Sequence, residues 1–470
     1  MKPTFHVRLW DIKTKPTDLK TGRRPRRPYG VRWVTAGREH SRWFATKALA
    51  RAFLSKLQQA MNRGEPFDVV GGLPDSLYRE ENSRTLLQIA ERFIAREWPD
   101  VAANTRRRYV DTLAVAVGSY TRDSRVTRPP ERHLRRSLTA GLLPANRGVS
   151  DLPPELHAAT AWVEEHSRPV SDLTDKEEMA ALLRNLGRNL NGAEAAPHTI
   201  RTRRSTLYHA LGFAVEIGEL PSNPVAAVQT GREQGTSEID PRVVVNPRQA
   251  QQLLAAVSYV GRWHPEGTLR KTTSYDYLIA FFATMYYGAL RPAEVNRLRE
   301  TDCKLPDSGW GELLLERSAA RSNARYVDAG TAWEARPLKR RRDGAVRVVP
   351  IPPQLVTTLR DHLDSFGTTD DGRLFRGVKD GQPISPTVYT DVWKRARLIG
   401  FSPEQAASPL ARRPYDLRHA AVSTWLAAGV PIAEVAARAG HTVDVLLKVY
   451  AKVLDGQRDS SNSRIDDILR

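Results

Sequence analysis

The stretch Gly288-Ala-Leu-Arg-Pro-Ala-Glu-Val295 lies where one predicted helix ends and another begins. The preceding residues, 275–287, are almost all apolar and predict a buried helix. Pro292 is favourable at the first position of the next helix, because the N–H that proline lacks has no helical partner there. Arg291 is therefore expected on a tight turn beside a helix start, where backbone N–H groups also point outward and attract anions.

A second piece with a basic residue at a junction is the pair 338–339, Leu-Lys. It precedes a predicted hairpin tip at 343–344 and a strand over 346–349. Lys339 is the only lysine of this predicted hairpin and begins a Lys-Arg-Arg-Arg run.

Two further pieces follow near the end of the chain. Pro414-Tyr-Asp-Leu-Arg-His419 opens a predicted helix, and Ala439-Gly-His441 precedes Tyr450 by nine residues. An isolated arginine is usually a solvated group or an ion-pair partner, and a lone tyrosine on an apolar helix usually packs in the core. The order and the spacing of the pieces, with His441 placed 23 residues after Arg418, are much more specific than any single piece.

Together these pieces resemble the catalytic domain of the tyrosine recombinase (phage integrase) family. The resemblance covers about 243–454. The helical segment before it is similar to the family's core-type DNA-binding domain, and the basic N-terminal segment is more loosely similar to an arm-type DNA-binding domain.

The resemblance implies a role for each polar residue. Arg291 and Arg418 would clamp the non-bridging oxygens of a DNA phosphate, because a guanidinium stays charged and offers bidentate donors. Tyr450 would attack phosphorus, which gives a 3′-phosphotyrosine link and a free 5′-hydroxyl. Lys339 would protonate the leaving 5′-oxygen, and His441 would hydrogen-bond the phosphate or move a proton. No metal, cofactor or ATP is implied.

Three expectations accompany these roles. Glu294 is expected to orient Arg291 or to cap its helix. Tyr415 stands where the family usually has a histidine, three residues before the second arginine, and is assigned a tentative phosphate contact. Arg340 and Arg341, next to the predicted catalytic lysine, are expected to contact the DNA backbone.

The charge of the chain agrees with a nucleic-acid partner. The 470 residues carry a formal net charge of +19, and residues 1–60 hold 15 Lys and Arg against three Asp and Glu. Such a field attracts polyanions, although a solubilising tail or a membrane surface would also fit composition alone. The single cysteine, Cys303, excludes an intrachain disulfide framework and a cysteine-rich zinc site. Without a long apolar stretch or a signal peptide, we expect a cytoplasmic protein.

We expect a multidomain, mainly α protein. The first domain, 1–66, is predicted as a hairpin over 29–34 and 41–45 followed by a helix over 47–62. We expect the helix to bury a face made of Leu49, Phe53, Leu54, Leu57 and Met61. The aromatic residues Trp33, Trp43 and Phe44 are expected in its core, and the tentative DNA contacts are Arg23, Arg24, Arg26 and Arg27.

The second domain, 76–232, is predicted as helical, with helices over 85–98, 103–120 and 198–218. An insertion at about 121–196 carries shorter helices at 151–166 and 173–190. Basic residues near two helix starts are the tentative DNA contacts, namely Arg106, Arg107, Arg201, Arg203 and Arg204. The third domain, 240–470, is predicted as mixed α/β, mostly helical and catalytic, with helices that include 415–428, 431–438 and 442–454.

These features favour a site-specific recombinase that integrates and excises a mobile element. A resolvase-like recombinase and a type IB topoisomerase fit the domain layout less well, and the alternative from another class is a catalytically impaired DNA-binding regulator. The resemblance implies double-stranded attachment-site DNA and a homo-tetramer on DNA, and it allows a directionality factor. No membrane partner is expected. Either the helix after Tyr450 or the tail 455–470 is hypothesised to dock on a neighbouring subunit, through an apolar face of Leu454, Ile465, Ile468 and Leu469.

Overall fold

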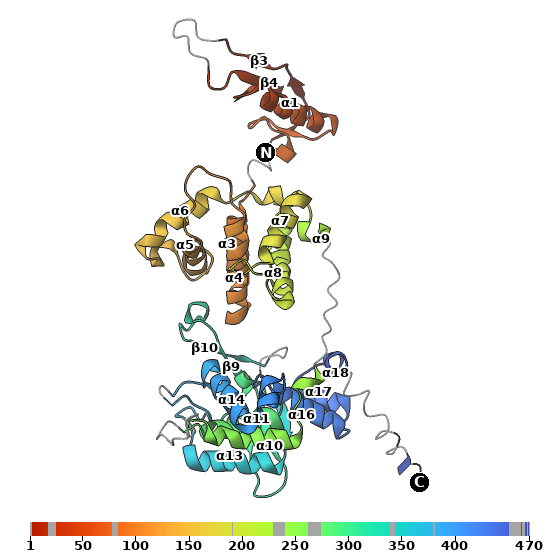
Figure 1. The fold of residues 1–470 in the computed structure, drawn as a ribbon. Coiled ribbons are helices and arrows are strands. Elements are labelled where there is room, and N and C mark those ends of the chain that lie inside the picture. Colours follow the sequence, from red (N-terminus) through yellow and green to blue (C-terminus); the bar gives the residue numbers. More distant parts are fainter. Residues whose placement is uncertain are drawn as a thin grey trace. The chain divides into compact units, whose positions relative to one another are not determined.

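The computed structural model describes residues 2–16, 25–77, 83–189, 191–228, 240–261, 274–338, 344–378 and 381–450, together with 462, 466, 467 and 469. The chain divides into two compact units, 1–233 and 234–470, which have separate apolar cores. Helices dominate, and the strands form small sheets, which confirms the predicted mainly α class (Figure 1). None of the described helices combines the length and the apolar character needed to cross a bilayer.

The first unit begins with a small antiparallel sheet whose order is β2-β4-β3, with β5 paired to β4. The predicted hairpin is confirmed: β4 and β5 pair from Tyr29↔Phe44 to Thr35↔Arg38. Ala36 and Gly37 make the turn with positive φ angles of 47° and 86°, as a tight hairpin turn requires. The elements of this part are β1 (Pro3–Thr4), β2 (Val7–Leu9), β3 (Lys13–Thr14), β4 (Tyr29–Thr35), β5 (Arg38–Phe44), α1 (Lys47–Asn62) and β6 (Phe67–Asp68).

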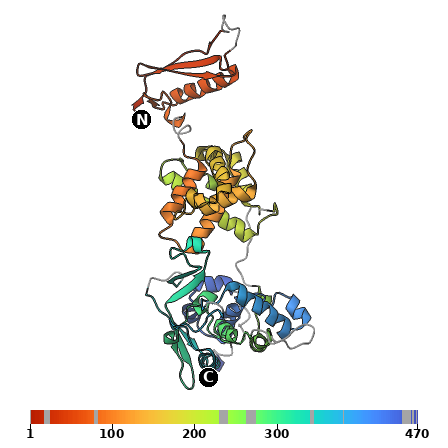
Figure 2. The same ribbon diagram turned by 90° about the vertical axis from the view of Figure 1, so that its left-hand side faces the viewer.

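Helix α1 lies along this sheet (Figure 2) and has the predicted bounds, with the Thr46 side chain accepting a hydrogen bond from the Leu49 N–H. The predicted buried face was wrong at both ends, because Leu49 and Met61 are 54% and 41% exposed. The helix instead buries Ala50, Phe53, Leu54, Leu57 and Ala60. At its two ends the helix therefore buries an alanine, Ala50 or Ala60, and not the larger Leu49 or Met61.

The aromatic residues of the sheet divide between its two faces. Trp33 is buried, and Phe44 packs against the same core, as predicted. Trp43 pairs with Gly30 instead, so strand alternation places it on the face opposite Val31 and Trp33. Half-buried there, it packs over Gly30, and the Lys15 ammonium lies 4.1 Å from its ring centroid. The prediction of a core position for Trp43 was therefore wrong.

The remainder of the first unit is helical, as predicted. Helix α3 begins with a capping box between Thr85 and Gln88. In the described part of region 121–196 there is one α-helix more than predicted. This helix is α5, and the π-helical turn η1 extends it. The elements are α3 (Leu86–Glu97), α4 (Ala103–Ser119), α5 (Glu131–Ser137), η1 (Leu138–Leu142), η2 (Val149–Asp151), η3 (Pro154–Leu156), α6 (His157–His166), η4 (Val170–Thr174), α7 (Lys176–Leu186), α8 (Pro197–Glu216) and α9 (Pro224–Ala227).

The second unit packs around α11 (Tyr277–Tyr287), which is buried on nearly every side, as its unbroken apolar sequence predicted. Phe281, Phe282 and Met285 are fully buried, and their neighbours include α10, α13, α14 and α16. The other helical elements of this part are η5 (Pro241–Val243), α10 (Pro247–Tyr259), α12 (Pro292–Val295), η6 (Glu300–Asp302), η7 (Ala324–Tyr326), α13 (Pro353–Phe366), α14 (Pro386–Gly400) and α15 (Pro403–Ala407).

The strands of the second unit form two small antiparallel sheets, β11-β8-β7 and β10-β9. The strand predicted at 346–349 is present as β11, but it pairs with β8, and β10 pairs with β9. The predicted hairpin between the strands on either side of residues 339–343 was therefore wrong for the described residues. The strands are β7 (Cys303–Lys304), β8 (Gly311–Leu315), β9 (Arg317–Arg321), β10 (Trp333–Pro337) and β11 (Arg347–Ile351).

Three helices close the second unit: α16 (Asp416–Ala427), α17 (Ile432–Ala439) and α18 (Val443–Val449). They enclose a small apolar cluster of their own that includes Leu426, Val435 and Leu446. Helix α18 is shorter than the predicted 442–454, because Tyr450 already has non-helical backbone angles of −115° and 18°. These helices, α12 and β11 carry the candidate site.

Candidate active site

Arg291 lies on the tight turn that the sequence predicts. Helix α11 ends before Gly288, Ala289 has a positive φ of 51°, and Arg291 is the N-cap of α12. A positive φ in a residue other than glycine is strained and is found preferentially at functional sites. The Arg291 guanidinium donates through Nη2 to the Gly440 carbonyl at 3.2 Å and is about one-fifth exposed, at 22%.

Glu294 orients Arg291, as expected. Its Oε2 accepts the Arg291 backbone N–H at 2.9 Å, and its Oε1 accepts Nη1 at 2.7 Å. The same buried carboxylate binds Arg347 on β11, at 2.7 Å and 3.2 Å. Burial alone would raise the pKa of Glu294, but the adjacent charges of Arg347, Arg291 and Arg418 lower it to about 2. The carboxylate is therefore ionised and stabilises a cluster of arginines.

Arg347 is a site residue that the sequence did not reveal. Its side chain is 2% exposed, and its Nη1 also reaches the Ala439 carbonyl at 3.5 Å. A Cβ at Gly440 would lie 2.2 Å from this Nη1, and Gly440 has a φ of +62°. Glycine is therefore needed after α17 both for its left-handed backbone and for the close approach of Arg347. The alternation of the strand 346–349 could have indicated an inward-facing arginine.

Arg418 connects the turn before α12 to the end of α17. It is fully buried on α16, and its two Nη groups donate to the carbonyls of Ala289 and Ala439. Its Nη2 also contacts His441 Nε2 at 2.8 Å. Burial, and then the charge of Arg291, lowers the pKa of Arg418 to about 10, so it remains a cation at neutral pH.

His441 is held as a neutral imidazole with one defined tautomer. Burial, followed by the charges of Arg418 and Arg291, lowers its pKa to about 3. Because a guanidinium can only donate, Nε2 must be the acceptor in the contact with Arg418, and Nδ1 carries the proton. Within the described residues, the buried Nδ1 of His441 and the buried Nε of Arg418 have no hydrogen-bond partner. These two N–H donors thus lack an acceptor among the residues that the structure describes.

Tyr450 is 1% exposed and lies in the apolar cluster of α16, α17 and α18. Its hydroxyl contacts His419 Nδ1 at 3.0 Å, and the ring centroids are 6.1 Å apart. Burial raises the pKa of Tyr450 above its usual range, although the nearby Arg418 opposes this shift. The phenol is therefore protonated in this state, and its partner His419 directly follows Arg418 in the chain.

The structure thus gathers Arg291, Arg418 and His441 at the end of α17, where Arg291 bonds the Gly440 carbonyl and Arg418 bonds His441. Tyr450 is brought to this group through His419. Tyr415 lies beside Arg291 and places its ring 5.1 Å from that of His419. The predicted positions Lys339, Arg340 and Arg341 lie outside the described residues, as do Arg23, Arg24, Leu454, Ile465 and Ile468. Among the described residues, no three His, Cys, Asp or Glu side chains are gathered so that they could hold a metal ion.

Because His419 and His441 are neutral in the folded protein, we predict that its free energy of unfolding decreases in acid. Their pKa values in the fold, about 4 for His419 and about 3 for His441, lie below the 6.5 of an unfolded histidine. As the pH falls below 6.5, the histidines of the unfolded chain bind protons that those of the folded protein do not bind. The stabilisation is therefore fully present above this pH and is lost as the pH falls towards the folded pKa values. Between about pH 7 and pH 5 we expect a loss on the order of 1–2 kcal/mol for each histidine.

Urea unfolding of the wild type and of His441→Asn at both pH values measures this effect. The variant should lose less stability on acidification, because one of the two groups is removed. Glu294 does not contribute in this window, since the stabilisation from its lowered pKa persists until the pH falls below about 4.5. An equal loss in both proteins would contradict the neutral state assigned to His441.

The tentative DNA contacts of the first unit differ in their surroundings. Arg26, Arg27 and Arg201 are exposed. Arg106 is only 5% exposed and donates from Nε to the Trp98 carbonyl at 2.8 Å, so it supports the end of α3. Arg203 donates to the carbonyls of residues 186 and 188, and Arg204 to those of residues 225 and 228. These last three residues have structural partners that the sequence did not reveal.

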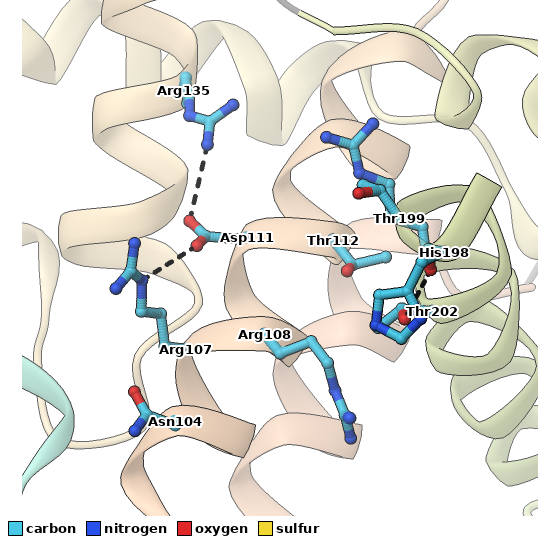
Figure 3. A pocket seen from close by; sticks show the side chains of 10 residues that line it. Asn104, Arg107, Arg108, Asp111, Thr112, Arg135, His198, Thr199 and Thr202 are labelled. Carbon is cyan, nitrogen blue, oxygen red and sulfur yellow. Dashed lines mark hydrogen bonds and ion pairs between the residues drawn. The ribbon is translucent and has the colours of Figure 1, made fainter. Parts of the chain in front are cut away.

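A pocket of about 400 Å³ lies between α4, α5 and α8 (Figure 3). Asp111 points into it and binds Arg107 at 3.5 Å and Arg135 at 3.6 Å. Arg107 is still 56% exposed, so only part of its charge is engaged. The pocket is otherwise lined by Asn104, Arg108, Thr112, His198, Thr199, Thr202 and Arg203. Basic and hydroxyl groups therefore share one concave surface of the helical region.

Comparison with known proteins agrees with the resemblance seen in the sequence. No family model matches the chain. A putative prophage phiRv2 integrase of Mycobacterium tuberculosis is 28% identical over 167 residues, which are 35% of this chain and 39% of that protein. The match therefore spans well under half of the relative's length.

Among solved structures, a transposon integrase shares the fold. A Tn1549 transposon integrase in complex with a circular intermediate DNA has a TM-score of 0.50 and 16% identity, and the match covers 78% of this chain and 95% of that chain. A lambda integrase dimer bound to a COC′ core site has a TM-score of 0.47 and 14% identity, over 91% of this chain and 93% of that chain. The chain therefore shares its fold with the transposon integrase, and about a third of it is similar in sequence to a prophage integrase.

Proposed function

We propose that the chain is a site-specific DNA recombinase that cuts and rejoins DNA through a 3′-phosphotyrosine at Tyr450. The observation that carries the proposal is the pair of buried donors, Arg418 Nε and His441 Nδ1, that lack partners within the described residues. They lie in one cationic cluster with Arg291. A phosphodiester group supplies both the charge and the acceptor oxygens that such a cluster lacks.

The proposed reaction follows from where charge develops. Attack by Tyr450 on phosphorus increases the negative charge on the non-bridging oxygens, which Arg291, Arg418 and the His441 Nδ1–H would bind. Glu294 keeps Arg291 and Arg347 fixed before the substrate arrives, so little reorganisation is needed. Lys339 is our candidate for protonating the leaving 5′-oxygen. The covalent bond preserves the energy of the cut strand, so the proposal needs no metal and no nucleotide cofactor.

The remaining assignments belong to the same proposal. We divide the chain into an arm-type DNA-binding domain (1–66), a core-type DNA-binding domain (76–232, with its insertion at about 121–196) and a catalytic domain (240–470). The exposed Arg26, Arg27, Arg107 and Arg201, together with Arg23, Arg24, Arg340 and Arg341, are our candidates for backbone contacts. The proposed partners are double-stranded attachment-site DNA, three further copies of the chain, and a directionality factor, and the proposed setting is the cytoplasm.

A covalent-trapping experiment tests the proposal. Nicked duplexes made from the element's candidate ends release a short strand on cleavage and so trap the adduct. We expect the wild type to remain bound to DNA after denaturation, whereas Tyr450→Phe, which lacks the attacking oxygen, should form no adduct but bind the same duplex. Tight binding without any wild-type adduct would instead favour the catalytically impaired DNA-binding relative, with Tyr415 as the residue to examine first.

A further inference from the structure

The hydroxyl of Tyr450 has a hydrogen-bond partner that the proposed reaction has not used. His419 Nδ1 lies 3.0 Å from it, inside the range of a normal hydrogen bond. We propose that His419 is a catalytic residue, whose imidazole orients the Tyr450 oxygen and accepts its proton when that oxygen attacks phosphorus. This inference rests on the proposed function and adds a proton acceptor to it.

Helix α16 explains why His419 can serve the nucleophile and the phosphate site together. Arg418 and His419 are successive residues, so their side chains leave the helix about 100° apart. Arg418 points toward Ala289 and the end of α17, and His419 toward Tyr450. The oxygen that attacks and the cation that binds the attacked group are therefore set by one rigid turn of helix.

Among the titratable groups that the structure describes around the hydroxyl, none fits the role equally well. Tyr415, four residues before His419, carries a hydroxyl and has no basic ring nitrogen. The Nε2 of His441 is occupied by Arg418. Arg418 and Arg413 are cations and can only donate. A neutral imidazole can accept a hydrogen bond at one nitrogen, and the phenol beside it is protonated, so the pair is complementary.

The surroundings of His419 also suit an imidazole that holds a proton only during the reaction. Burial, then the charges of Arg418 and Arg413, lowers the pKa of His419 to about 4, so the ring is neutral and free to accept. A phosphodiester bound to Arg418 would offset part of that positive field. The imidazole would then become more basic only when substrate is in place, which suits an acceptor needed during the attack.

In the cleavage step, the bond between Tyr450 Oη and phosphorus forms and the bond from phosphorus to the 5′-oxygen breaks. The phenolic proton passes to His419 Nδ1. The 5′-oxygen takes a proton from the general acid, which we assign to Lys339. In rejoining, the 5′-hydroxyl attacks the phosphotyrosine and gives its proton back to the residue that served as general acid, while His419 returns its proton to the departing phenolate.

Two substitutions and one control test the inference by single-turnover adduct formation on the nicked duplex. His419→Leu removes the acceptor, and His419→Asn keeps an oxygen near the position of Nδ1 that accepts a hydrogen bond but not a proton. His362→Leu is the matched control, because His362 is a buried histidine of α13 whose Nε2 bonds the Leu374 carbonyl. Thermal unfolding and DNA affinity show whether each variant folds.

We expect His419→Leu and His419→Asn both to slow adduct formation by about 10²–10⁴-fold at neutral pH, and His362→Leu to leave the rate of the folded protein unchanged. The rates of the two His419 variants should rise more steeply with pH, since hydroxide must then remove the proton. A duplex with sulfur as the bridging 5′-atom should not rescue them, because a thiolate leaving group replaces only the general acid.

Three results would overturn the inference. A His419→Leu rate within about threefold of the control would show that the contact is structural. Recovery of the wild-type rate in His419→Asn would show that His419 only orients the oxygen. Absence of an adduct from the wild type itself would remove the proposed function and this inference together, which distinguishes that failure from the first two.

Discussion

Replacement of Arg418 by Gln is expected to slow covalent adduct formation by about a hundredfold or more. Arg418 touches the turn before α12, the end of α17 and His441. The amide of glutamine is uncharged and cannot reach all three. The variant therefore loses both a donor to the phosphate and the tautomer of His441 that the guanidinium imposes.

The matched control for Arg418 is Arg397→Gln. Arg397 is a buried arginine of α14 that also donates to backbone carbonyls, those of Ala406, Ser408 and Leu410, at 3.0 Å each. Both variants should lower thermal stability, but only Arg418→Gln should slow the chemistry of the folded protein. Equal adduct rates in the two variants would mean that Arg418 is a structural arginine.

Replacement of Glu294 by Gln is expected to destabilise the second unit by about 3–5 kcal/mol, the usual effect of removing one partner of a buried ion pair. Glu294 and Arg347 are both 2% exposed, so neither water nor salt can replace the lost charge. Arg291 also loses its stronger partner. We expect adduct formation to decline as well, because the arginines are no longer held in place.

An ion pair with an exposed carboxylate provides the comparison for Glu294. Glu434 on α17 is 47% exposed and binds Arg438 one turn later. Glu434→Gln should change the free energy of unfolding by no more than about 1 kcal/mol, as exposed pairs do. Urea unfolding followed by circular dichroism measures both variants. A loss in Glu294→Gln as small as that in Glu434→Gln would refute the buried arginine cluster.

Much of the fold follows from local pattern. The hairpin β4–β5 was predictable from strand alternation around Gly37, and α11 from an unbroken apolar run. The wrong predictions concern features that tertiary contacts determine. Leu49 and Met61 fit the helical period of α1, yet alanines face the sheet there. The strand 346–349 was predicted correctly, but its partner is β8, a non-local pairing that turn signals near residue 344 could not indicate.

The site residues likewise fall into those that the sequence pattern indicates and those that only tertiary contacts define. Motif order and spacing pointed to Arg291, Arg418, His441 and Tyr450, and the first three lie together around the end of α17. Arg347 was missed because a single arginine within a strand has no distinctive spacing. Its importance comes from pairing with Glu294, 53 residues away in sequence. His419 lies within the motif 414–419, but its contact with Tyr450 depends on how α18 packs against α16.

The identity of the linked residue tests the central claim most directly. Adduct formed by the wild type on a nicked duplex would be digested with nuclease and protease and mapped by mass spectrometry. The account predicts a nucleotide joined through its 3′-phosphate to the side chain of Tyr450, with a 5′-hydroxyl on the released strand. A nucleotide attached to any other residue, or joined through a 5′-phosphate, would contradict it.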